Sequence, residues 1–191
     1  MGGRSTPRPG TGLVLGATVL SEGLLFGLAA LILFWSGRES LLAQLVPQID
    51  PALVAGVGAG AGLAGAVLVL LLYRLWPGFR RSAESVLALF RQLSLPVLAV
   101  VSLLSALGEE ALFRGALQPI LGLWGAALVF ALVHTGLKRE LWAYGVTAFL
   151  VGVLFGLAYQ FTGELWSPVV GHALYNLLIS AAIGAGCLRS S

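Results

Sequence analysis

The chain has 191 residues, of which 58% are hydrophobic and only 10% are charged. Soluble domains are about 45–50% apolar and about 25% charged, so this composition excludes an ordinary soluble domain and indicates an integral membrane protein. The single cysteine, Cys187, excludes an internal disulfide bond, and a net charge of +3 is too small to indicate a nucleic-acid partner.

The hydropathy pattern predicts a polar tail followed by six membrane-spanning helices. Residues 1–11 are rich in glycine and proline, and we expect a disordered tail there. The next apolar run is too long for a cleaved signal peptide, so we expect a retained helix. Since a span needs about 20 residues, the predicted spans are 12–36, 52–76, 95–118, 123–137, 141–161 and 167–188. We therefore expect an all-α polytopic membrane protein with a single transmembrane domain, residues 12–191.

Residues 77–94 differ from the spans around them. Their apolar residues recur at helical spacing, opposite a charged face; the apolar set is Val86, Leu87, Leu89, Phe90 and Leu93, and the charged set is Arg80, Arg81, Glu84 and Arg91. This pattern predicts an amphipathic helix that lies on the membrane surface.

Basic residues divide unequally between the two sides that six spans would create. One side would hold Arg38 alone, and the other would hold Arg4, Arg8, Arg74, Arg80, Arg81, Arg91, Lys138, Arg139 and Arg189. Since positively charged loops stay in the cytoplasm, we expect both termini there, in a bacterial cell membrane.

The segment 55–66 is rich in glycine but is no nucleotide-binding loop, because it follows no strand and lacks a following lysine. Gly56 with Gly60, and Gly58 with Gly62, form small-xxx-small pairs that let transmembrane helices pack closely. We therefore predict a helix-packing role for this segment.

Several polar residues lie deep in the predicted spans, where a charge costs at least ~2.5–3.5 kcal/mol. At about 1.5 Å per residue, Glu109, His134 and Asn176 would lie roughly 13, 15 and 14 Å below the outer boundary, and His172 roughly 8 Å. Three helices therefore bring polar groups to similar depths, which predicts one shared site. Glu22, in the first span, has no motif around it; its two candidate roles are an interior hydrogen-bond partner and a substrate-cavity residue, and we expect the former.

Spacing along each helix separates the roles of these residues. Glu110 and Arg114 are four residues apart, so they share a face and can neutralise each other. Glu109 points about 100° away from Glu110, which leaves it free to face a cavity. His172 and Asn176 are also four residues apart and share a face.

One carboxylate, two imidazoles and one carboxamide in a low-dielectric cavity suit amide hydrolysis by an activated water. Glu109 beside a histidine can accept a proton from water, and a second histidine with an asparagine amide can donate to an oxyanion. We expect the Glu109 carboxylate and the His134 ring to face one cavity, near enough to share a water. Cys187 lies at a helix end with no nearby histidine in sequence, so nothing indicates an acyl-enzyme nucleophile.

The same residues resemble the motifs of a known family. EEALFR (Glu109–Arg114) resembles an EExxxR motif, FALVH (Phe130–His134) an FxxxH motif, and HALYN (His172–Asn176) an HxxxN motif. In this order they are similar to the motifs of the CPBP family of intramembrane proteases. This family is also called the Abi or CAAX-protease family and is related to the type II CAAX prenyl endopeptidase. The resemblance covers residues 95–190, which would form the catalytic core.

The resemblance implies an intramembrane endopeptidase that cleaves a membrane-associated or lipidated protein or peptide. It implies that Glu109 is the catalytic glutamate, with His134 as its partner in activating water. His172 and Asn176 would stabilise the oxyanion, and Glu110 and Arg114 would support the site. We expect no cofactor; the alternative is a zinc ion held by Glu109, His134 and His172, although no HExxH pair is present.

Two other functions remain open at this stage. A non-catalytic immunity or scaffold protein with the same fold would work without Glu109. A proton-coupled transporter would use Glu109 and the histidines to relay protons, but the sequence shows no long internal repeat that would support a transporter.

Overall fold

The computed structural model describes residues 10–136 and 138–188, and it confirms an all-α protein. Residues 1–9, where most of the predicted tail falls, lie outside the described residues. Thr11, which we assigned to that tail, is instead the first residue of a helix. No strand occurs among the residues that the structure describes.

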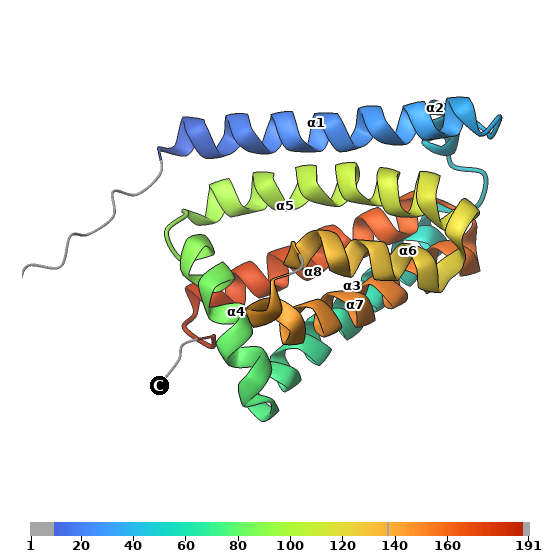
Figure 1. Cartoon of the computed structure of the whole chain (residues 1–191). Coiled ribbons are helices and arrows are strands. Elements are labelled where there is room, and N and C mark those ends of the chain that lie inside the picture. Colours follow the sequence, from blue (N-terminus) through green and yellow to red (C-terminus); the bar gives the residue numbers. More distant parts are fainter. Residues whose placement is uncertain (1–9, 137, 189–191) are drawn as a thin grey trace, which may run out of the picture.

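Within the described part of the chain, ten helical elements follow one another. They are α1 (Thr11–Trp35), α2 (Leu41–Gln44), α3 (Pro51–Leu75), α4 (Pro77–Phe90), α5 (Leu95–Glu110), the π-helix η1 (Ala111–Leu117), α6 (Gln118–Thr135), the 3₁₀ helix η2 (Arg139–Leu141), α7 (Trp142–Thr162) and α8 (Trp166–Gly184). The long helices lie side by side, and α1 runs along α5 at the edge of the bundle (Figure 1).

The described residues contain 5 helices long and apolar enough to cross a membrane, not six separate ones. They are Thr11–Trp35, Pro51–Leu75, Leu95–Thr135, Arg139–Thr162 and Trp166–Gly184. The third candidate has 41 residues because no loop separates α5, η1 and α6. The predicted third and fourth spans are both present within it, but they are joined by a bend rather than by a loop.

The bend lies at Gly122, where φ is 71° and ψ is 175°. A positive φ is readily accessible only to glycine, so the chain turns there while helical residues continue on both sides. In Figure 1, α5 and α6 run in opposite directions, as two antiparallel spans would. The start of α1, the end of α8 and helix α4 consequently lie at one end of the bundle.

Helix α8 begins differently from our expectation. The sixth predicted span begins at residue 167, but the helix already starts at Trp166, after an N-cap at Leu165. Ser167 is fully buried, and its Oγ has no hydrogen-bond partner among the residues that the structure describes. Local sequence signals define helix ends only to within a few residues.

Of the two predicted glycine pairs on α3, one packs against α8. A Cβ at Gly62 would lie 2.3 Å from the carbonyl oxygen of Gly171, and one at Gly58 would lie 2.3 Å from the oxygen of Ser167. Gly56 and Gly60 have open space within 4 Å. The predicted packing role is therefore confirmed for Gly58 and Gly62 only.

Helix α4, predicted as an interfacial helix, crosses the end of the bundle (Figure 1). Its apolar face is buried, with Phe79 at 2% and Ala83 at 3% exposure, and lies against α7 and α3. Ser82 fastens the helix: its hydroxyl donates to the carbonyl of Glu140 at 3.0 Å and accepts from the backbone N–H of Tyr144 at 3.1 Å. Helix α4 therefore closes part of the space between the spans.

Candidate active site

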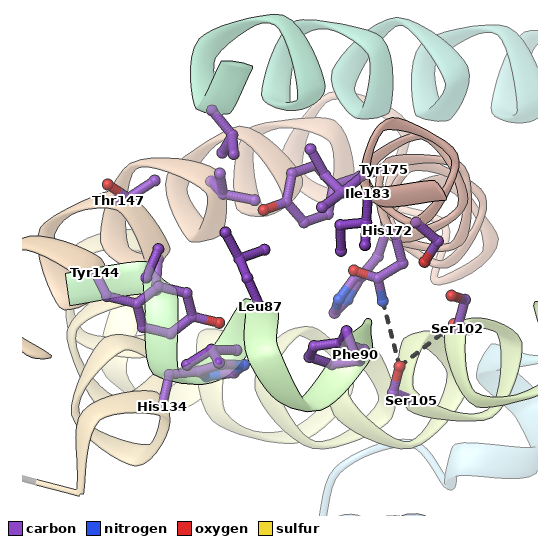
Figure 2. A pocket seen from close by; sticks show the side chains of 18 of the residues that line it. Leu87, Phe90, Ser102, Ser105, His134, Tyr144, Thr147, His172, Tyr175 and Ile183 are labelled. Atoms are coloured by element: carbon purple, nitrogen blue, oxygen red, sulfur yellow. Dashed lines mark hydrogen bonds between the residues drawn. The ribbon is translucent and has the colours of Figure 1, made fainter. Parts of the chain in front are cut away.

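A cavity of about 430 Å³ lies in the bundle beneath α4. Apolar side chains of α3, α4 and α8 form much of its wall. The polar side chains in the wall are those of Glu22, Tyr73, Ser102, Ser105, Glu109, His134, Tyr144, Thr147, His172, Tyr175, Asn176 and Ser180. Figure 2 shows His134 and Tyr144 on one side of this space and His172, Ser102 and Ser105 on the other. The four residues that we predicted to be catalytic, Glu109, His134, His172 and Asn176, all line this one cavity.

Glu109 and His134 face each other across the cavity wall. The carboxylate Oε2 of Glu109 lies 3.6 Å from Nε2 of His134, and the two side chains are 16% and 24% exposed. The expectation that they face one cavity is confirmed. A separation of 3.6 Å is too long for a direct hydrogen bond, but a water molecule beside the pair could contact both groups.

The backbone of its own helix orients His134. Its Nδ1 lies 2.8 Å from the carbonyl oxygen of Phe130, one turn earlier. A carbonyl oxygen can only accept a hydrogen bond, so Nδ1 carries the proton. The Phe130 ring packs on the imidazole at 4.2 Å between centroids. In the neutral ring, the nitrogen that faces Glu109 is therefore an acceptor.

Glu110 is fully buried and stands at the centre of a separate network. Its carboxylate accepts a hydrogen bond from Nη1 of Arg114 at 3.0 Å, as the spacing predicted. The other guanidinium nitrogen, Nη2, donates to the carbonyl of Gly152 at 2.7 Å. Arg114 also lies over the Phe130 ring, 5.0 Å from its centroid. These contacts compensate the buried positive charge of Arg114, whose removal from water would otherwise cost much free energy.

His172 joins this network, which the sequence did not indicate. Its Nδ1 lies 2.7 Å from Oε1 of Glu110, and its ring stacks on Phe155 at 5.0 Å. Since the carboxylate accepts from Nδ1, the nitrogen left over is Nε2. For Nε2 to donate to an oxyanion, the ring must carry both protons, and the Glu110 carboxylate then lies next to the positive ring. Glu110 therefore contacts both the buried Arg114 and His172, which lines the cavity.

A π-helix carries this network. The segment η1 follows Glu110 directly and holds Arg114, and all of its residues except Leu117 are buried. Helices of this kind are rare and occur often at functional sites. Glu109 and Glu110 are the last two residues of α5, and the offset of about 100° between adjacent helical residues gives their side chains different surroundings.

Glu22 lies on the cavity wall, which is the second of its two candidate roles and not the one we expected. Its Oε1 accepts only from the neighbouring Ser21 hydroxyl at 3.4 Å, and its Oε2 is buried without a hydrogen-bond partner among the described residues. A Cβ at Gly108 would lie 2.5 Å from this oxygen. The carboxylate thus packs against the backbone next to Glu109.

The cavity is also lined by hydroxyl groups, to which sequence reasoning gave no role. They belong to Tyr73, Ser102, Ser105, Tyr144, Thr147, Tyr175 and Ser180. Serine and threonine are common in transmembrane helices, so their presence alone carried no signal. Among them, only Ser105 had a signal in the sequence, because it lies one helical turn before Glu109 and shares its face.

The residues of the alternative zinc site do not converge. Glu109 and His134 lie together, but the Nδ1 of His172 is directed at Glu110. Within residues 10–136 and 138–188, no group of three His, Cys, Asp or Glu side chains could hold a metal ion.

Comparison with known proteins supports the resemblance that the three motifs indicated. Residues 91–178 match the family described as type II CAAX prenyl endopeptidase Rce1-like. A segment of 95 residues is 35% identical to the uncharacterized protein YpbD of Bacillus subtilis (strain 168). This segment covers 50% of the chain and 50% of that relative. The chain therefore spans about half the length of the curated relative it matches. No solved structure matches the chain.

Proposed function

We propose that this integral membrane protein is an intramembrane endopeptidase. In support, residues 91–178 match the Rce1-like family, in agreement with the family that the motifs predicted. It cleaves a peptide bond of a membrane-associated or lipidated protein, and it works in a bacterial cell membrane. The observation that carries this proposal is the pair formed by Glu109 and His134, 3.6 Å apart on the wall of one cavity.

The reaction uses a water molecule next to this pair. Glu109 takes a proton from the water while Nε2 of His134 accepts a hydrogen bond from it, and the water oxygen attacks the carbonyl carbon of the scissile bond. The negative charge that develops on the carbonyl oxygen accepts hydrogen bonds from Nδ2 of Asn176 and Nε2 of doubly protonated His172. When the C–N bond breaks, the proton held by Glu109 passes to the leaving amine nitrogen. The products are a carboxylic acid and an amine, and Glu109 is again a carboxylate.

The cavity wall favours an apolar substrate segment. Among the described residues that line it there is no lysine or arginine, and its larger part is apolar. A peptide that reaches the site from the bilayer or its surface would keep its apolar side chains out of water. This supports a membrane-attached or lipidated substrate rather than a soluble one.

A scaffold protein and a proton-coupled transporter are less well supported. A scaffold gains nothing from a carboxylate and an imidazole placed on an open cavity, and such groups cost stability when they are buried. The match to a protease family favours hydrolysis over proton transport.

The experiment compares C-terminal peptides of the membrane proteome in cells that carry the native chain or Glu109→Gln. We expect at least one product that the native chain forms and Glu109→Gln does not. The control Glu39→Gln should form the same product, because Glu39 is exposed and does not line the cavity. Identical peptide sets with the native chain and Glu109→Gln would refute the proposal. Proton flux into liposomes containing the native chain, without any cleaved product, would instead support a transporter.

A further inference from the structure

The hydroxyl of Ser105 lies between α5 and α8 and contacts one of the proposed catalytic residues. Its Oγ accepts a hydrogen bond from Nδ2 of Asn176 at 3.3 Å. The same Oγ donates to the backbone carbonyl of Ser102 at 3.4 Å. The dashed lines of Figure 2 mark both contacts. Both are long for hydrogen bonds, as is common in catalytic sites without substrate, where such contacts tighten when substrate binds.

These two contacts determine which end of the Asn176 carboxamide faces Ser105. A serine hydroxyl has a single proton, and here the Ser102 carbonyl accepts it. Only the lone pairs of Oγ remain for Asn176, so the asparagine must present its NH₂ group and not its carbonyl oxygen. The network therefore decides the orientation of an amide whose two ends have nearly the same shape.

The orientation matters because an oxyanion needs a donor. The NH₂ group of Asn176 has two protons, of which Ser105 accepts one. The second remains for a ligand in the cavity that both residues line. In the reversed orientation the amide would present Oδ1, an acceptor, which repels a negatively charged oxygen.

We propose that Ser105 is a positioning residue that holds the Asn176 carboxamide with an N–H directed at the oxyanion. This rests on the proposed hydrolase function. Ser105 and Glu109 lie one turn apart on α5, as His172 and Asn176 do on α8, so the base and the oxyanion donor are aligned through the same pair of helices. The side chain of Ser102 has no part in this, because only its backbone carbonyl is used.

The test measures cleavage of a synthetic peptide that spans the site identified by the C-terminal peptide comparison, with the full chain in proteoliposomes. We expect Ser105→Ala to lower kcat about tenfold or more with KM changed less than twofold, since removing an oxyanion donor itself costs ~10²–10³ in kcat. Ser105→Thr keeps the hydroxyl and should retain activity within about threefold. Ser36→Ala is the matched control: it removes an exposed hydroxyl that donates to the carbonyl of Leu33, three residues earlier, and that does not line the cavity. We expect it to keep the native kcat to within about twofold.

A double variant separates positioning from a general effect on the fold. If Ser105 acts through Asn176, adding Ser105→Ala to Asn176→Ala should lower kcat by less than about twofold further. Unchanged kcat in Ser105→Ala, or a full additional loss in the double variant, would overturn the proposal. Absence of cleavage by the native chain would instead overturn the hydrolase function on which it rests.

Discussion

Glu109 and Glu110 are adjacent in the chain, but their carboxylates have different surroundings. Glu109 is 16% exposed and borders a cavity. Glu110 is fully buried and holds Arg114 and His172. A group that must receive a proton from water needs access to water, whereas a group that neutralises a buried cation must exclude it. The two glutamates should therefore respond differently to mutation.

We predict that Glu110→Ala destabilises the protein by about 3–5 kcal/mol, since it leaves Arg114 as an uncompensated buried charge. Glu109→Ala should retain the native stability to within about 1 kcal/mol, because it removes a group with no ion pair to a buried arginine. Denaturant unfolding in detergent micelles, followed by tryptophan fluorescence, measures both. Equal losses of stability would contradict the separate roles.

We also predict that hydrolysis needs no metal ion. The donor atoms of Glu109, His134 and His172 are not brought together, so a chelator should have no metal to remove from them. Cleavage by the purified protein should be unchanged after treatment with EDTA and with 1,10-phenanthroline. Loss of cleavage that zinc restores would contradict this expectation.

At the scale of elements, the contact of α3 with α8 depends on glycines on one face of α3. The backbones approach so closely that a Cβ at Gly62 would lie 2.3 Å from the oxygen of Gly171. Since α8 carries His172 and Asn176, this contact also sets the position of two proposed catalytic residues. Without a hydrophobic force between helices in lipid, such close packing is a main source of association.

We predict that Gly62→Ala destabilises the protein by about 1–3 kcal/mol, because the added methyl group forces α3 away from α8. Gly60→Ala, two residues away on the open face, should be neutral or stabilising by up to ~1 kcal/mol, since alanine is the better helix former. Thermal unfolding of the two variants in the same detergent compares them directly. A destabilised Gly60→Ala with a native-like Gly62→Ala would reverse our assignment of the two faces.

At the scale of the whole molecule, helix α4 and the far end of α8 lie at one end of the bundle, with the start of α1 (Figure 1). Most basic residues occur in segments near this end, whereas Arg38 follows α1 at the other. By the positive-inside rule, we therefore expect α4 to lie on the cytoplasmic side.

We predict that the Arg81→Cys variant reacts with membrane-impermeant maleimide only after the cells are opened, and that the Glu39→Cys variant reacts in intact cells. Both positions are exposed and lie on opposite sides of the predicted topology. Cys187→Ser removes the native thiol from both variants and provides the background control. The reverse labelling pattern would place the termini outside the cytoplasm.

Much of the class and of the site could be predicted from the sequence, because those features depend on periodicity within one helix. Apolar composition indicates a membrane protein, and a spacing of four residues pairs Glu110 with Arg114 in any helix. The angular offset between adjacent residues likewise separates Glu109 from Glu110. The depth of polar residues along their spans predicted that Glu109 and His134 would meet.

Other features required the tertiary structure, because they depend on how far each helix is rotated and how closely it approaches its neighbours. Periodicity within α8 does not say that His172 contacts Glu110, or that Asn176 contacts Ser105. It also does not say which glycine face of α3 meets α8. The number of separate spans depended on Gly122, whose positive φ lets the chain turn where the sequence indicated a loop.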